Sequence, residues 1–189
     1  MVALFDVKSA PIPDNRERGA ETRGVFAQFP DNLQDLIEGV AGCSPYLNAS
    51  LLREADWLGQ VAEAPISQVF QSLLVIEGES FQKLSDNLRI AKRRAALLIA
   101  LADLGGLWTL NDVTKALTEL ADTAVQKALE FLVAAEIARG KLPGCAESDI
   151  PQAAGMVALA MGKQGAGELN YSSACYLIML FYEIRFPVD

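Results

Sequence analysis

Hydrophobic residues recur every three or four positions through most of the chain, a spacing typical of amphipathic helices rather than strands. The pattern is clearest from about Ser80 to Leu104, and again from Thr109 to near Gly140. Gly105 and Gly106 separate these stretches, and Thr109 followed by Asp112 is close to a capping box. We therefore predict two long helices whose apolar stripes are core.

Shorter helices are predicted upstream. Asp31 and Ser44 are suitable N-caps, and Pro45 fits a first helical turn. Two further helical stretches are expected near 50–63 and 65–76. Residues 1–30 contain several prolines and glycines and show no sustained period, so an irregular lead-in is expected there. Residues 31–142 are then a helical bundle domain.

The period changes after Lys141. Residues 143–154 are rich in Pro, Gly and small residues and are predicted to be a linker. Gly155–Met161 suits a buried strand and Tyr176–Tyr182 a second strand, with a glycine-rich turn at 162–167 and a helical turn at 168–173 between them. We expect the strands to lie against the long helices or to pair with another chain. The fold class is mainly α: a helical bundle followed by an α/β strand-turn-strand segment over 155–189.

Composition excludes several kinds of chemistry. The 189 residues contain no histidine, which removes Ser-His-Asp catalysis and His-ligated zinc. With 24 acidic against 16 basic residues the net charge is −8, which argues against nucleic acid or an anionic membrane as the main partner. The N-terminus does not resemble a signal peptide, and no apolar run approaches the ~20 residues of a membrane span. Three widely separated cysteines favour a reduced, cytoplasmic chain with buried or incidental thiols.

The glycine-rich turn is the best candidate for chemistry. Gly162 and Gly165 let a backbone approach phosphate oxygens, and Lys163 adds positive charge. The glycines match neither a P-loop nor a Rossmann fingerprint. Spacing alone therefore leaves two interpretations open, a phosphate-binding turn and a turn that merely needs positive φ.

Three separated stretches resemble one family: MVALAMGKQGAGELNYSS at 156–173, KRRAALLIALADLGGLWTL at 92–110, and GCSPYLNASLLR at 42–53. They are similar to the N-terminal part of the bifunctional glutamine synthetase adenylyltransferase/adenylyl-removing enzymes. Members of that family are several times longer and carry two nucleotidyltransferase domains, one removing AMP from a glutamine synthetase tyrosine by phosphorolysis and one adding it from ATP.

The resemblance implies the start of the AMP-removing half, truncated inside its first nucleotidyltransferase domain. It implies Mg²⁺ and ATP or ADP as the family's cofactors, and glutamine synthetase and a PII-type signal protein as partners. The positions that match the nucleotide-side motif are Gly162, Lys163, Gly165, Asn170, Ser172 and Ser173.

The chain departs from the family directly after this motif. The family continues with Asp-x-Asp, two carboxylates on one face of a strand that hold Mg²⁺, but here the positions are Ala174 and Tyr176. Neither side chain binds Mg²⁺, and the Tyr176 ring is expected to enter the space that the metal ions occupy in the family. We therefore assign no catalytic and no metal-binding residue and expect the chain to be inactive alone. A truncated or altered gene copy and a non-catalytic module that binds glutamine synthetase or a PII-type protein both remain open, as does self-association through the incomplete sheet.

Three other features are given structural interpretations. Lys92-Arg93-Arg94 is expected to be a solvated helix face, with docking of an acidic partner as the alternative. Trp57 and Trp108 are expected to pack at helix junctions, and Cys175 to be a small buried side chain.

Overall fold

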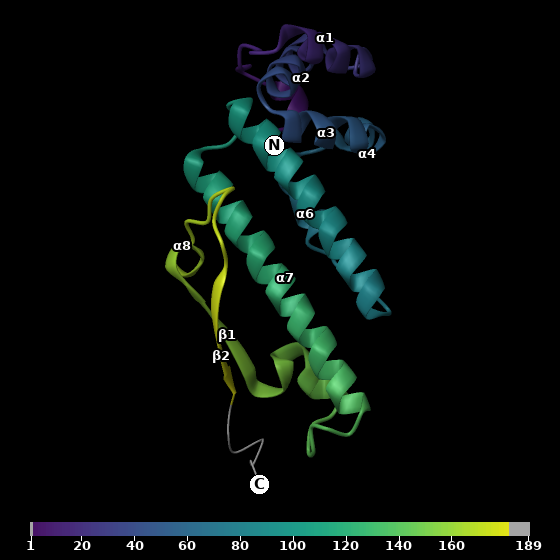
Figure 1. The fold of residues 1–189 in the computed structure, drawn as a ribbon, viewed down its shortest axis with the longest axis vertical. Helices are drawn as coiled ribbons and strands as arrows, with labels where there is room; N and C mark the ends of the chain where they lie inside the picture. The colour runs from purple at the N-terminus through teal and green to yellow at the C-terminus, as the bar shows by residue number, and fades with distance from the viewer. Residues whose placement is uncertain (1, 182–189) are drawn as a thin grey trace. The chain divides into compact units, whose positions relative to one another are not determined.

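The computed structural model describes residues 2–181 of the chain. This part is mainly helical with one two-stranded sheet, which confirms the predicted fold class. Contacts divide the chain into two compact units, Met1–Val75 with Arg89–Ala116 and Ile76–Leu88 with Leu117–Asp189. The division passes through both long helices, α6 (Phe81–Leu104) and α7 (Leu110–Ala138) (Figure 1). The domain limits expected from the sequence remain a prediction.

The first unit is built around α2 (Asp31–Cys43). Leu33, Leu36 and Ile37 of α2 are 0% exposed, as the apolar spacing predicted. Helix α2 begins one residue earlier in the chain than expected: Pro30 is its N-cap, and Asp31 is its first residue rather than its cap. An acidic side chain is favourable in a first turn as well, because it faces the positive end of the helix dipole. Helix α3 (Pro45–Arg53) packs against α2, and the unit also contains α4 (Ala55–Val61), α5 (Ile66–Leu73) and the C-terminal part of α6.

The expectation of an irregular lead-in over residues 1–30 is wrong. The segment contains a 3-10 turn, η1 (Leu4–Asp6), and the helix α1 (Arg16–Val25), which Asn15 caps by accepting from the Arg18 amide at 2.9 Å. Helix α1 is polar almost throughout and buries only Gly19 and Thr22, so it shows no hydrophobic period. Its position depends on close packing: a Cβ at Gly19 would lie 2.7 Å from the Glu38 carbonyl oxygen.

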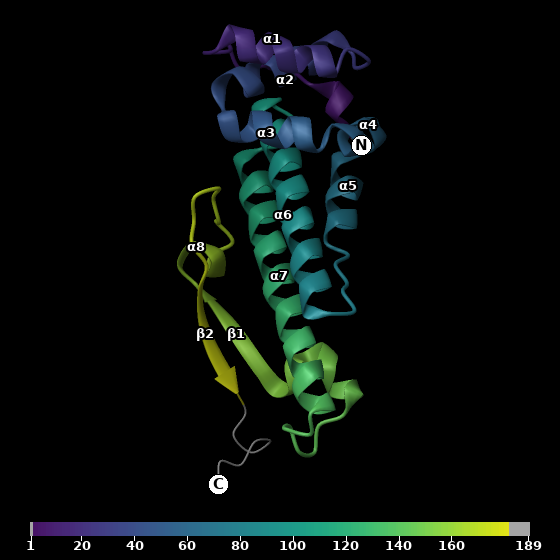
Figure 2. The ribbon, with the colours of Figure 1, turned by 45° about the vertical axis from the view of Figure 1, so that its right-hand side comes forward.

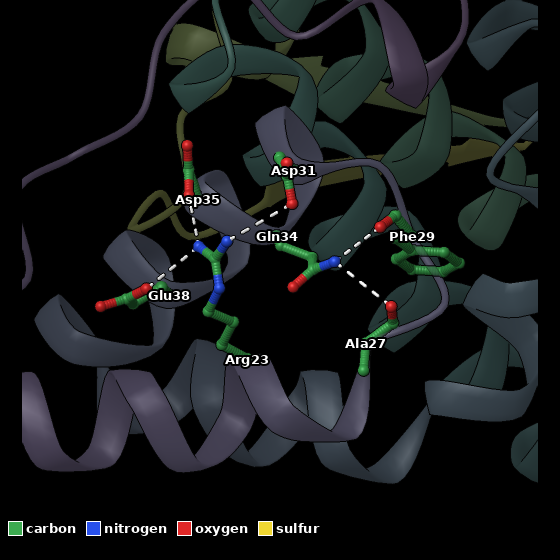
Figure 3. Close-up of polar contacts among 7 residues, drawn as sticks. All are labelled: Arg23, Ala27, Phe29, Asp31, Gln34, Asp35 and Glu38. Atoms are coloured by element: carbon green, nitrogen blue, oxygen red, sulfur yellow. Dashed lines mark hydrogen bonds and ion pairs between the residues drawn. The ribbon is translucent and has the colours of Figure 1, made fainter.

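Polar contacts join α1 and the following loop to α2 (Figure 3). The guanidinium of Arg23 reaches three carboxylates of α2, those of Asp31 at 3.9 Å, Glu38 at 3.2 Å and Asp35. Hydrogen bonding and charge attraction from Asp35 are the main favourable causes that raise the pKa of Arg23. On the same helix, the Gln34 amide donates to the carbonyl oxygens of Phe29 and Ala27, at 2.6 and 3.3 Å. The first two helices are thus tied together by side chains that carry no hydrophobic signal.

Two capping predictions are confirmed. The Ser44 hydroxyl accepts from the Leu47 amide at 3.2 Å at the start of α3. At the start of α7 the Thr109 amide donates to the Asp112 carboxylate at 2.9 Å, and the Asp112 amide donates to the Thr109 hydroxyl at 3.3 Å. The hydrogen bonds from Thr109 lower the pKa of Asp112. This reciprocal pair is a capping box with Asp in place of the usual Glu.

The second unit places the sheet beside α7. Strands β1 (Met156–Met161) and β2 (Tyr176–Phe181) run along the C-terminal part of that helix in both ribbon views (Figures 1 and 2). The segment expected to be a linker contains the 3-10 segment η2 (Glu147–Gly155), and its residues Ala153 and Ala154 are buried with Val133 of α7. Ala153 and Ala154 have positive φ, of 48° and 52°. The chain is therefore packed, rather than free, where it turns from α7 into β1.

The strands pair antiparallel, from Met156 opposite Phe181 to Met161 opposite Tyr176. The expectation of a buried first strand is wrong. Along β1 half-buried and exposed residues alternate, with Val157, Leu159 and Met161 on the exposed face, and every residue of β2 is exposed. A run of consecutive apolar residues suggested burial on both faces, but in this two-stranded sheet only one face is turned towards α7. Tyr182, which ended the predicted second strand, lies outside the described residues.

Candidate functional site

The connection between β1 and β2, residues 162–175, holds all six positions that the family resemblance assigned to nucleotide binding. It begins with a single helical turn, α8 (Gly162–Gly165), directly after β1. Gly162 and Gly167 have φ of +62° and +74°, a region that glycine adopts without strain. Gly165 meets a different constraint, because a Cβ there would lie 2.3 Å from the Ala160 carbonyl oxygen. Glycine is thus favoured at each of these three positions, at two of them by the positive φ and at Gly165 by the lack of room for a side chain.

Helix α7 fixes this connection through two side chains one turn apart. The buried amide of Gln164 donates from Nε2 to Oδ1 of Asp122 at 2.9 Å. Further along the connection, the backbone N–H of Leu169 donates to the Thr118 hydroxyl at 3.3 Å, and Leu169 is itself 7% exposed. Because Thr118 and Asp122 lie on one helix face, they hold both ends of the glycine-rich segment. Sequence reasoning missed both residues, which read as ordinary surface positions of a long helix.

The second half of the connection is a tight turn around Asn170. Its Oδ1 accepts from the Ser173 hydroxyl at 2.7 Å and from the amide and hydroxyl of Ser172 at 3.2 and 3.3 Å. The Ser173 amide donates to the Asn170 carbonyl oxygen at 3.1 Å. The prediction of a helical turn at 168–173 is therefore wrong, because the asparagine side chain replaces helical hydrogen bonds with a local network.

The structure brings the six predicted positions into one connection but gives them different surroundings. Gly162, Lys163 and Gly165 form the turn after β1, and Lys163 is exposed. Asn170, Ser172 and Ser173 hydrogen-bond to one another and so shape the turn. A four-residue helix contributes little dipole to hold an anion, so any phosphate contact here depends on backbone N–H groups and Lys163. Nucleotide binding by these residues remains a prediction.

Ala174 and Tyr176, which stand where the family has its metal-binding Asp-x-Asp, lie beside this turn. Tyr176 is directly opposite Met161, the residue before Gly162, so the strand register places it next to the glycine-rich segment. Tyr176 is 69% exposed and Ala174 is also exposed. Mg²⁺ takes oxygen ligands, chiefly carboxylates, and neither side chain supplies one, so these residues do not fit a magnesium site. Among residues 2–181 no group of three His, Cys, Asp or Glu side chains has the arrangement of a metal site.

Cys175 between these positions is exposed, so the prediction of a small buried side chain is wrong. Cys43 is also exposed and Cys145 is partly buried, and all three cysteines are free thiols. The prediction placed Cys175 in the second strand, but it lies in the connection directly before β2 begins at Tyr176.

A second polar cluster, in the first unit, lies around Glu54 between α3 and α4. Its carboxylate is 4% exposed and accepts from Nε of Arg93 at 2.5 Å and from Nε of Arg94 at 2.7 Å. Arg94 also lies over the Trp57 ring, 5.2 Å from its centroid. Burial by itself raises the pKa of Glu54, but the hydrogen bonds from Arg94 and Arg93 outweigh it and the pKa lies below its ordinary value.

This cluster corrects the expectation that Lys92-Arg93-Arg94 is a solvated face. Two of the three cations serve a buried carboxylate, and their side chains are only 22% and 33% exposed. Trp57, at 9% exposed, packs as predicted, and Trp108 meets Phe70 edge-on at 6.1 Å. Nothing in the local sequence around Glu54 marks it as buried, because its partners lie about forty residues further along the chain.

Comparison with known proteins identifies the family to which this chain belongs. The family model described as glutamate-ammonia ligase adenylyltransferase matches residues 33–186, and the chain belongs to that nucleotidyltransferase family. It is 42% identical over 169 residues to the bifunctional glutamine synthetase adenylyltransferase/adenylyl-removing enzyme of Rhodopseudomonas palustris (strain TIE-1), covering 84% of this chain and 16% of that protein.

Proteins of the same description from two other bacteria are also similar to this chain. The one from Bradyrhizobium sp. (strain BTAi1 / ATCC BAA-1182) is 41% identical over 78% of this chain and 16% of its own length. The one from Xanthobacter autotrophicus (strain ATCC BAA-1158 / Py2) is 45% identical over 53% and 10%. The chain thus spans 16–18% of the length of these relatives that match most of it. No solved structure matches it.

Proposed function

We propose that residues 155–181 are the nucleotide-side part of an adenylyl-removing nucleotidyltransferase domain, and that this chain alone does not remove AMP from glutamine synthetase. The observation that carries the proposal is the strand register, which puts position 176 beside the glycine-rich turn. The residue at that position is tyrosine, where the family has a carboxylate. With Ala174 as well, both expected metal-binding carboxylates are absent from their positions. Loss of such catalytic groups commonly lowers a rate by several powers of ten.

A phosphorolysis assay tests this directly. The purified chain is incubated with adenylylated glutamine synthetase, Mg²⁺ and inorganic phosphate, and release of ADP is followed. We expect no release above a protein-free control, with a full-length relative as the positive control. Turnover by the chain that a heat-inactivated sample lacks would show that the assignment of inactivity is wrong.

A second function is favoured by the open face of the sheet. Tyr176, Ile178 and Leu180 of β2 share this face with three residues of β1, and all six side chains are 44–69% exposed; the β1 residues are Val157, Leu159 and Met161. An apolar surface of this kind is typical of an interaction site. We propose as the alternative function a non-catalytic module that binds glutamine synthetase or a PII-type signal protein through this face.

Calorimetric titration separates the two binding candidates. Glutamine synthetase and a PII-type protein are titrated separately into the chain. For whichever protein binds, the I178D substitution is expected to abolish the heat of binding. L110D, at a position 76% exposed at the start of α7, is the matched control and should leave binding unchanged. No heat with either protein would remove this function.

Self-association is a further outcome that the exposed strand allows. An exposed apolar edge strand is a template for pairing with another chain. We propose that the chain forms dimers through β2, and light scattering after size-exclusion chromatography tests this. A strict monomer across a wide concentration range would contradict it.

We also propose that the protein works in the cytoplasm, where nucleotides are available. Among residues 2–181, no helix combines the length and apolar character of a membrane span. Microscopy of a fluorescent fusion and fractionation of cell extracts test the localisation, and recovery in the membrane fraction would contradict it.

A further inference from the structure

A pocket of about 380 Å³ lies in the second unit between α7 and β1. Its walls are mixed. The apolar side chains come from Val125 and Leu129 of α7, Ala158 and Ala160 of β1, and Leu177 of β2, and the polar ones from Asp122, Gln126, Gln152 and Gln164. Ala160 and Tyr176 lie on opposite faces of the sheet, because Tyr176 pairs with Met161, the next residue of β1. The pocket, which we call the α7–β1 pocket, therefore opens on the face of the sheet opposite to Tyr176.

The small side chains of β1 explain why the space is open. Along the strand, Ala158 and Ala160 occupy the face turned towards α7, where larger side chains would fill a sheet–helix interface. A volume of 380 Å³ is within the range of small-molecule sites.

Gln164 gives the pocket an unmet hydrogen-bonding group. The residue lines the pocket, is 3% exposed, and donates from Nε2 to Asp122. An ionised carboxylate only accepts hydrogen bonds, so Asp122 fixes the amide orientation and the other end must be Oε1. That oxygen is buried and has no hydrogen-bond partner among the described residues. A buried acceptor left unpaired costs about 1–3 kcal/mol, which a donor on a ligand would recover.

The charge of the pocket indicates which donor fits. Among the described residues that line it, Asp122 carries the one formal charge, and it is negative. An anion is disfavoured beside that carboxylate, whereas a cation with N–H groups can pair with Asp122 and donate to Gln164. The apolar side chains of Val125, Leu129 and Leu177 in the lining favour an alkyl body on the same molecule.

We propose that the α7–β1 pocket binds a small aliphatic primary amine in its ammonium form. The ammonium group hydrogen-bonds to the Asp122 carboxylate and to Oε1 of Gln164, and the alkyl chain lies against Val125, Leu129 and Leu177. Because Oε1 is closed to solvent, its bond to the ligand requires a small displacement of the Gln164 side chain. The site depends on no metal and does not require the chain to act on a nucleotide.

Chemical-shift titration of the full chain with n-butylammonium chloride tests the proposal. We expect saturable shifts of the Gln164, Asp122 and Ala158 amides at millimolar ligand, weaker binding of n-butanol, and no saturable shifts with sodium butyrate or sodium chloride. Absence of saturable shifts with n-butylammonium would overturn the proposal and leave an enclosed water as the partner of Gln164. Equal binding of butyrate would overturn it as well.

Three variants make the test specific. Q164L removes the acceptor and fills part of the space, so binding should be lost while the chain stays folded. D122N keeps a side-chain acceptor for Gln164 but removes the charge, and should weaken binding about tenfold, the effect of losing one exposed ion pair plus its hydrogen bond. E147Q, an exposed acid in η2 outside the pocket, is the matched charge control and should bind like wild type. Unchanged binding in Q164L would show that the ligand sits elsewhere.

Discussion

The backbone of Gly165 lies directly against the carbonyl of Ala160, so close that a Cβ would be 2.3 Å from the oxygen. Contact of this kind cannot be relieved by rotating a flexible side chain, since the oxygen belongs to the strand backbone. We predict that G165A displaces the turn after β1 and destabilises the chain by about 1–3 kcal/mol, the usual cost of overpacking. Urea denaturation followed by circular dichroism measures the change.

Gly167 in the same connection provides the control for G165A. It has φ of +74° with no atom within 4 Å of a built Cβ, so only conformation restricts it. G167N should cost no more than about 1 kcal/mol, because asparagine tolerates the left-handed region. If G165A were as mild as G167N, the close approach to Ala160 would not hold in solution.

Glu54 is predicted to be the most sensitive charged residue of the first unit. Replacing it by glutamine leaves Arg93 and Arg94 without their common carboxylate, and breaking a buried ion pair from one side costs about 3–5 kcal/mol. Part of that is offset here because both arginines are partly exposed, at 22% and 33%. Urea denaturation of E54Q should show a large decrease in the free energy of unfolding. D56N, which changes a nearby exposed acid, should alter it by less than about 0.5 kcal/mol.

The lowered pKa of Glu54 also predicts a pH dependence. A carboxyl group whose pKa is lower in the folded than in the unfolded state stabilises the fold above its ordinary value of 4.5, and this contribution is lost as pH falls through the folded pKa. The difference in unfolding free energy between wild type and E54Q should therefore be constant above about pH 5.5 and shrink in more acidic solution. A difference that grows on acidification would contradict the pKa direction.

The packing of the N-terminal segment is testable at Gly39 of α2. A Cβ at this position would lie 2.0 Å from the Pro11 carbonyl oxygen, so G39A should push residues near Pro11 away from α2. We expect a loss of about 1–3 kcal/mol and faster proteolysis of the segment before α1. G59A in α4 is the control, since nothing lies within 4 Å of its built Cβ, and it should be neutral or slightly stabilising.

Nucleotide binding is predicted to be independent of metal. Thermal-shift measurements with ATP and ADP should give the same stabilisation, or none, with and without Mg²⁺, because Ala174 and Tyr176 offer no carboxylate. The double variant A174D/Y176D restores two carboxylates beside the glycine-rich turn and should introduce a Mg²⁺-dependent shift. A Mg²⁺-dependent shift already present in the wild type, and unchanged in the variant, would contradict the prediction.

Much of the fold could be predicted because its signals are local. The stripe of α2, the capping box of Thr109 and Asp112, and the strand-turn-strand order each depend on residues within a few positions of one another. The family could also be predicted, from the motif at 156–173 and the stretch at 92–110, and the match over residues 33–186 confirms it. The replacement of both expected carboxylates by Ala174 and Tyr176 was visible in the sequence alone.

The sequence could not predict what depends on partners far along the chain. Helix α1 is held by the backbone of α2 at Gly19 and by the contacts of Arg23, neither of which produces a hydrophobic period. The buried Glu54 is hydrogen-bonded by arginines about forty residues away, and the buried Gln164 donates to an aspartate of α7. The exposure of β2 was also decided by tertiary structure, because an apolar strand is buried only where other elements cover it.

The sequence by itself determined the helices from α2 to α7, the two strands, the family to which the chain belongs and the absence of the family's two metal-binding carboxylates. Each of these is a property of residue identity and short spacing. Tertiary structure decided which charges are buried, which turn residues α7 holds, and where a pocket remains behind the sheet. The physical reason is that burial, hydrogen-bond partners and free volume are set by elements brought together only when the chain folds.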